Sequence, residues 1–168
     1  MWFRQPHVID ASIIIQRAVA DVFGYYRDLT NMPRFLGDVV AVEPRGADTY
    51  QWTIRGPWRI RGHWTVRVTE RRENTLIRYE TVAPRWRRVT WEVRFVSGPE
   101  CGETRVREIL RLPFGWFGMR IMALLGKHPV TEVGDNLKRL KEVLETGRVL
   151  SYRRAVPRSC PSAWTRLL

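Results

Sequence analysis

With 168 residues, the chain is long enough to form one domain with a sizeable core. Its hydrophobic fraction of 44% argues against an intrinsically disordered protein, and its eight tryptophans favour a dense aromatic core or a lined cavity. The formal net charge of +12 would draw the protein to nucleic acid or to an anionic membrane, although charge alone identifies neither partner.

The N-terminal part of the chain predicts one strand followed by two short helices. Residues 8–16 contain three consecutive isoleucines, which favour a strand. Residues 19–29 repeat apolar side chains at helical spacing, so we expect a short amphipathic helix there. Asn31 is placed to cap a second, very short helix over residues 32–36. Pro33 would fall in the first turn of that helix, where a missing N–H costs little.

Apolar and polar residues alternate from residue 38 to about residue 112, which predicts six strands. Turn-forming residues separate the alternating runs at residues 46–48, 72–74 and 97–99. Connections this short join antiparallel neighbours. Clean alternation also predicts a sheet with one buried face and one face open to water.

The C-terminal part predicts a long helix and then a tail. Residues 114–126 are apolar nearly all round, and Pro129 indicates a kink or a restart of the helix. The apolar residues beyond this point lie on one helical stripe, namely Val130, Val133, Leu137, Leu140 and Leu144. Gly147 provides a stop. Residues 148–168 are basic and show no sustained period, so we expect them to be disordered or loosely docked.

The potentially reactive side chains are scattered. Cys101 and Cys160 fit no metal or redox spacing, and reduced thiols in the cytoplasm are the simplest interpretation. The histidines are isolated from one another, so we expect neither a metal site nor a cofactor. The chain shows no N-terminal signal pattern and no apolar run long enough to span a bilayer. We therefore expect a cytoplasmic protein, with peripheral contact to a membrane left open.

Several short motifs occur in the order typical of one superfamily. They are Ile13 and Ile15, Val22-Phe23, Asp28-Leu29, Pro33-Arg34-Phe35-Leu36, Val39 with Val42, Gly102-Glu103-Thr104-Arg105-Val106, and the run from Leu137 to Lys141. Through these motifs, residues 8–146 resemble the helix-grip superfamily of START lipid-transfer domains, birch-pollen allergens and polyketide cyclase/dehydrases (SRPBCC proteins). The strongest likeness is to the polyketide cyclase/dehydrase group.

The resemblance implies an α+β helix-grip fold, in which a strongly curved antiparallel sheet wraps around a long C-terminal helix. It implies one domain over residues 1–147 and leaves residues 148–168 as a basic tail. Members of the superfamily include hydrophobic-ligand binders, ubiquinone-binding chaperones, aromatase/cyclases and a ribosome-association factor, so no common catalytic set follows. Two residues depart from the usual pattern: Arg17 replaces a small residue, and Glu108 replaces an apolar residue that faces the cavity.

Alternation predicts which side chains line the inward face of the sheet. They are Trp52, Ile54, Trp64, Val66, Ile77, Tyr79, Trp91, Val93, Phe95, Val106 and Glu108. This lining suits a flat or apolar ligand in a cavity of roughly a few hundred Å³. The alternative is that the same side chains fill the core against the long helix.

Glu108 and Tyr79 are the candidate catalytic residues. A buried carboxylate must be paired, hydrated or protonated, and in a cavity Glu108 could act as an acid or base or anchor a ligand hydroxyl. Tyr79 could offer its hydroxyl to the same ligand, or it could be a buried structural residue. Alternatively, a bulge turns Glu108 outward, or Glu108 pairs with an arginine such as Arg17 or Arg120.

The outward face of the predicted sheet is rich in arginine, at Arg55, Arg67, Arg78, Arg94, Arg105, Arg107 and Arg111. The simplest interpretation is a solvated face that is partly neutralised by cross-strand pairs with Glu80 and Glu92. An RNA or ribosome surface is the alternative, but aromatic residues for base stacking are missing from this face. The basic tail, with Trp164, Leu167 and Leu168, could instead contact an anionic membrane weakly.

Together these features favour a protein that binds or carries a hydrophobic small molecule such as a lipid, a quinone or a polyketide-like aromatic. The first alternative is a cyclase or dehydratase that uses Glu108 as its acid or base. An RNA- or ribosome-associated factor is a less favoured alternative. The sequence decides neither the ligand, nor whether the protein is an enzyme, nor its oligomeric state.

Overall fold

The computed structural model describes residues 7–56, 60–83, 88–112 and 129–146. Its elements follow in the order β1 (His7–Ile15), α1 (Val19–Arg27), the 3-10 helix η1 (Leu29–Arg34), β2 (Val39–Pro44), β3 (Thr49–Arg55), β4 (Arg61–Arg72), β5 (Leu76–Ala83), β6 (Thr90–Ser97), β7 (Thr104–Leu112) and α3 (Pro129–Thr146). This order confirms the predicted helix-grip fold. Residues 114–126, the apolar first part of the predicted long helix, lie outside the described residues, as does the tail from residue 147.

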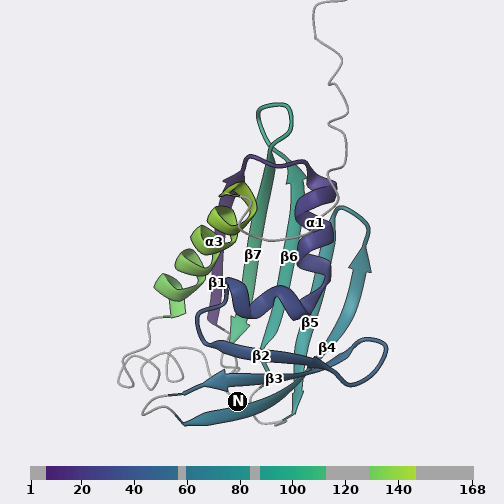
Figure 1. The fold of residues 1–168 in the computed structure, drawn as a ribbon, viewed down its shortest axis with the longest axis vertical. Helices are drawn as coiled ribbons and strands as arrows, with labels where there is room; N and C mark the ends of the chain where they lie inside the picture. Colours follow the sequence, from purple (N-terminus) through teal and green to yellow (C-terminus); the bar gives the residue numbers. More distant parts are fainter. Residues whose placement is uncertain (1–6, 57–59, 84–87, 113–128, 147–168) are drawn as a thin grey trace, which may run out of the picture.

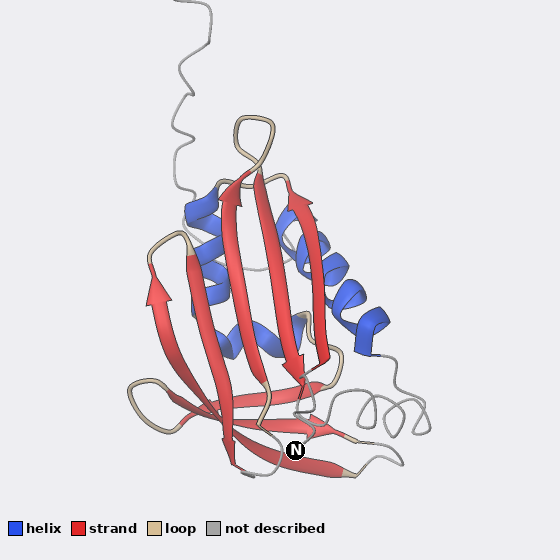
Figure 2. Ribbon diagram, turned by 180° about the vertical axis from the view of Figure 1, so that it is seen from behind, coloured by secondary structure: helices blue, strands red, loops and turns tan. Residues whose placement is uncertain are grey.

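All seven strands form one antiparallel sheet with the order β1-β7-β6-β5-β4-β3-β2. Shifts in the pairing register occur in β2 and β4, and such bulges bend and twist a sheet. As a result β2 and β3 run across the direction of β5, β6 and β7 (Figure 1). The described helices all lie on the concave face, and Figure 2 shows that they leave the convex face bare.

The concave face is buried by the helices as the apolar spacing predicts. On α1, Val22, Phe23 and Tyr26 are all buried, and the ring of Phe23 packs edge-on against that of Phe95 at a centroid distance of 5.4 Å. On α3 the predicted stripe is buried at Val133, Leu137 and Leu140 and partly buried at Leu144, whereas the side chain of Val130 is not described. The core therefore lies between the sheet and the two helices.

The turn after α1 differs from the sequence prediction. The short helix is a 3-10 helix over Leu29–Arg34, and Asp28 caps it by accepting a hydrogen bond from the Thr30 backbone N–H at 3.0 Å. Asn31 was expected to be the cap, but its side-chain amide donates to the Tyr25 carbonyl at 3.0 Å. Asp28 takes this role because α1 ends at Arg27, two residues earlier than expected, which exposes the next amides to its carboxylate.

The end of β1 is tied to the C-terminal end of α3. Arg17 donates through Nε to the Leu144 carbonyl at 2.9 Å and through Nη2 to the Glu145 carbonyl at 3.3 Å. Lys141 Nζ donates to the Ile14 carbonyl at 2.8 Å. The last carbonyls of a helix have no partner within the helix and attract positive charge. Arg17 therefore serves as a helix cap, and the suggested ion pair between Arg17 and Glu108 is wrong.

The structure bears on the expectations about a membrane span and about reduced thiols. No helix in the described ranges has the length and apolar character needed to cross a membrane. Cys101 is exposed in the turn between β6 and β7 and is disulfide-bonded, which departs from the expectation of reduced thiols. Cys160 lies outside the described residues.

Candidate functional site on the concave face

The predicted lining residues lie on the concave face. Those that are buried are Trp52, Val66, Ile77, Tyr79, Val93, Phe95, Val106 and Glu108. Ile54, Trp64 and Trp91 are partly buried and pack against the same core. The pairing register explains why they share a face, since it places side chains of equal orientation opposite one another across neighbouring strands, as at Val93 and Glu108.

Three of these residues form an aromatic surface across the bent sheet. Tyr79 on β5 stacks on its cross-strand neighbour Trp91 on β6, with ring centroids 5.1 Å apart and planes inclined by 13°. The ring of Trp52 on β3 lies 5.8 Å from that of Tyr79 and 6.0 Å from that of Trp91. Such a surface offers large apolar area and stacking contacts to a flat molecule.

Glu108 points from β7 into this apolar interior, so the alternative that a bulge turns it outward is wrong. It is 2% exposed, and its Oε2 has no hydrogen-bond partner in the described part of the chain. Burial raises the pKa of the Glu108 carboxyl from 4.5 to about 7, because the ionised form loses its hydration. Near neutral pH the group can therefore be either a proton donor or a proton acceptor.

A pair of tyrosine hydroxyls lies in the same interior. The Tyr26 and Tyr79 hydroxyl oxygens are 3.2 Å apart, and both side chains are fully buried. Burial raises the pKa of both phenols well above 10, and the nearby Glu108 adds to the effect. The sequence interpretation missed Tyr26 as a site residue. The available signal was a phenol on the apolar stripe of α1, where any buried hydroxyl needs a partner.

Trp52 supplies a further polar group to this region. Its Nε1 is buried and has no hydrogen-bond partner within the described ranges. An indole N–H can only donate, whereas a protonated carboxyl can donate one hydrogen bond and accept others. Leaving a buried donor or acceptor unpaired costs about 1–3 kcal/mol, so native proteins keep few such groups without a reason. The concave face thus combines aromatic area with polar atoms that a ligand could engage.

The predicted ligand cavity itself stays a prediction. Two surface grooves lie among the described residues, and neither is lined by Glu108 or Tyr79. The larger, about 620 Å³, is lined by Ala20, Gly24, Arg27, Asp28, Tyr50, Arg71 and Glu73. The smaller, about 260 Å³, lies between η1 and α3. Residues 113–128, which follow β7 directly, lie outside the described part.

Metal-binding side chains do not gather in the described residues. No group of three or more histidine, cysteine, aspartate or glutamate side chains there is placed to hold an ion. His63 is exposed, as alternation predicted, and its Nδ1 lies 3.4 Å from the Thr53 hydroxyl oxygen.

A comparison with protein families gives one match. The family described as "Polyketide cyclase / dehydrase and lipid transport" matches residues 6–145. A search of curated proteins found no match.

Solved structures show the same fold at low identity. A protein from Deinococcus radiodurans is 20% identical, with a TM-score of 0.66 over 83% of this chain and 98% of that chain. A START superfamily protein from Mycobacterium smegmatis is 15% identical, with a TM-score of 0.61 over 85% of this chain and 97% of that chain. The di-domain ARO/CYC protein StfQ of the steffimycin biosynthetic pathway is 13% identical, with a TM-score of 0.64 over 87% of this chain and 54% of that chain.

Proposed function

Because this chain belongs to the polyketide cyclase/dehydrase and lipid transport family, we propose that it binds a hydrophobic small molecule on the concave face of its sheet. The observation that carries the proposal is a pair of buried polar atoms beside an aromatic surface, Glu108 Oε2 and Trp52 Nε1, for which the described residues supply no hydrogen-bond partner. An interior that served packing alone would be more stable with apolar groups in their place.

The chemistry of these groups indicates the class of ligand. Below the pKa of Glu108, its carboxyl, the Trp52 indole and the spare hydrogen of the tyrosine pair are all donors. A ligand that suits them has a flat or extended apolar body and oxygen acceptors, as in a quinone, a polyketide-like aromatic or the head of a lipid. Burial of apolar ligand area, at about 25 cal/mol per Å², would supply the affinity, and the donors would set the orientation.

A second function, acid–base catalysis on such a ligand, is favoured by one observation. The Glu108 carboxyl has a pKa of about 7, so it can take a proton from a carbon or hydroxyl of the ligand and return it at a neighbouring position. Cyclisation and dehydration both need proton transfers of this kind. Tyr79 would then orient the reacting oxygen, because its hydroxyl lies in the same interior.

Native mass spectrometry of the purified protein, followed by extraction of the bound material, tests the proposal. We expect a co-purified apolar compound with oxygen substituents in the wild type, and much less of it in Trp91→Leu, which removes half of the Tyr79–Trp91 stack. Arg45→Gln is the matched control, because Arg45 is exposed directly after β2 and its side chain pairs only with the nearby Glu43 among the contacts described. Equal loss in both variants, or no bound compound together with no binding of added hydroxyanthraquinone or fatty acid, would contradict ligand binding.

Glu108→Gln separates the two functions. Glutamine keeps a hydrogen-bond donor at this position but cannot exchange a proton. A carrier retains its affinity for the extracted compound within a few-fold, whereas an enzyme keeps the affinity and loses conversion of the compound to product.

A further inference from the structure

We infer that the convex face of the sheet is a docking surface for an acidic protein, separate from the ligand-binding face. The face is formed by β4, β5, β6, β7 and β1, and the described helices leave it uncovered (Figure 2). From the point where β4 pairs with β5 and onward to β1, its charged residues are Arg67, Arg72, Arg78, Arg88, Arg94, Arg105, Arg107 and Arg111 with Asp10, Glu70, Glu80 and Glu92. Eight arginines against four carboxylates leave four positive charges in excess.

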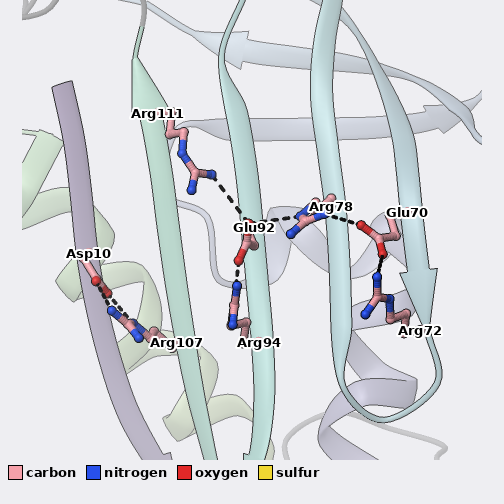
Figure 3. A network of polar contacts seen from close by, with 8 residues as sticks. All are labelled: Asp10, Glu70, Arg72, Arg78, Glu92, Arg94, Arg107 and Arg111. Atoms are coloured by element: carbon pink, nitrogen blue, oxygen red, sulfur yellow. Dashed lines mark hydrogen bonds and ion pairs between the residues drawn. The ribbon is translucent and has the colours of Figure 1, made fainter. Parts of the chain in front are cut away.

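The pairing register arranges these charges in rows that run across the strands. Glu70, Arg78, Glu92, Ile109 and Asp10 lie opposite one another in turn and form a central row that contains three of the four carboxylates. One flanking row contains Arg72, Arg94 and Arg107, and the other contains Arg67, Glu80 and Arg111. Figure 3 shows Arg72, Arg94, Arg107 and Arg111 of the flanking rows beside the central carboxylates.

The central carboxylate Glu92 holds three guanidinium groups in place. Arg94 Nε lies 2.6 Å from its Oε1, while Arg78 Nε and Arg111 Nη1 lie 3.0 Å and 3.6 Å from its Oε2. Although Glu92 belongs to the outward face, its side chain is only 4% exposed, because these arginines cover it. In the same way Glu80, 8% exposed, accepts from Arg67 at 3.1 Å and from Arg88 at 2.9 Å.

This arrangement holds the arginines in place without occupying all of their N–H donors. A guanidinium has five N–H donors, and Arg94 uses Nε on Glu92 while its side chain stays 52% exposed. Arg107, which lies directly opposite Arg94, is held by a bidentate pair with Asp10 and stays 51% exposed. Two like charges in this position repel unless anions neutralise them. Donors held in a fixed direction match further carboxylates at a lower entropic cost than free arginines do.

The composition of the face favours a protein over other anionic partners. The central carboxylates would repel a continuous phosphate backbone, whereas separate carboxylates of a protein can pair with the flanking rows alone. Aromatic residues for base stacking are missing from the described part of this face. Val8 and Val96, 49% and 58% exposed, lie on the same face and offer apolar contacts of the kind found in protein interfaces.

The test uses the full chain and poly-L-glutamate as the probe, with the variant Arg94→Gln/Arg107→Gln. The control Arg27→Gln/Arg34→Gln removes the same net charge from exposed arginines of α1 and η1, which lie on the other side of the sheet. We expect the convex-face variant to lose about five- to tenfold in affinity at 150 mM salt and the control less than twofold. Glu108→Gln should bind the probe like the wild type, which makes the result independent of the proposed ligand site.

A second measurement locates the contact directly. Modification of arginines by phenylglyoxal, mapped by mass spectrometry, should be suppressed by the probe at Arg94, Arg107 and Arg111 more than at Arg27 and Arg34. Equal losses of affinity in the two double variants, or equal protection of all arginines, would reduce the effect to net charge and overturn the inference. Tighter binding of a 20-base-pair DNA duplex or of anionic phospholipid vesicles through the same arginines would overturn it as well. Thermal unfolding of each variant confirms that the comparison is between folded proteins.

Discussion

Replacing Glu108 by glutamine is expected to stabilise the protein above neutral pH. In the folded state the pKa of the Glu108 carboxyl is about 7, against an ordinary value of 4.5. In the unfolded state the carboxyl loses its proton near pH 4.5, but in the folded state it keeps the proton until about pH 7. Stability is therefore unaffected at low pH, falls as the pH rises from about 4.5 to 7, and stays reduced above that. The free energy of unfolding above pH 7 is thus lower by roughly 3 kcal/mol than it is below pH 4.5.

Chemical denaturation at several pH values measures this effect. Glutamine does not ionise, so the free energy of unfolding of Glu108→Gln minus that of the wild type should increase by roughly 3 kcal/mol between pH 4 and pH 8.5. For a chain of this size the same gain would raise the melting temperature by roughly 5–10 °C at the higher pH. The change of this free-energy difference with pH is more informative than its absolute size. An effect of the substitution on packing is the same at every pH and therefore cancels. A difference that does not vary with pH would show that Glu108 is paired or hydrated, and would refute the reasoning.

Three further substitutions test other contacts. Glu92→Gln should destabilise the protein by about 2 kcal/mol at pH 7 in urea denaturation, and the loss should vanish in acid. Burial alone would raise the pKa of Glu92, but hydrogen bonds from Arg94 and Arg78 outweigh burial and lower the pKa. The stability that ionised Glu92 contributes is therefore lost as the pH falls through its pKa in the folded state. Arg17→Ala should lower the free energy of unfolding, measured by thermal unfolding, by about 1 kcal/mol, because two carbonyls at the end of α3 lose their donor. Arg17→Lys should lower it by less. Tyr79→Phe should cost about 1–2 kcal/mol, because the Tyr26 hydroxyl stays buried without its partner; an unchanged midpoint would show that this hydroxyl finds another one.

The direction of the strand side chains could be predicted from the sequence because it depends on a local period. Glu108 shares its parity with Val106 and Leu110, and this alone places its carboxyl on the buried face. The same parity predicted that Glu92 faces outward. It could not predict that Glu92 is buried there, since that depends on how long arginine side chains from neighbouring strands lie over it.

The contacts between distant segments could not be predicted from the sequence. Tyr26 meets Tyr79 only because α1 packs across the sheet, and neither the helical period nor the strand period contains that crossing. Arg17 was recognised as a departure from the family pattern, but its role became visible only where the end of β1 meets the end of α3. The cap of η1 was assigned to Asn31 because α1 was expected to continue to residue 29.

The indole N–H resonance of Trp52 gives the most direct test of ligand binding on the concave face. In a ¹⁵N–¹H spectrum of the full chain, assigned with Trp52→Phe, hydroxyanthraquinone should shift this resonance downfield, because the ligand's oxygen supplies an acceptor and no residue that the structure describes accepts from this buried N–H. The resonance of Trp91 should shift with it, since its ring lies 6.0 Å from that of Trp52. If added ligand shifts only resonances of solvent-exposed groups and leaves those of Trp52 and Trp91 unchanged, the concave face is not where this protein binds its ligand.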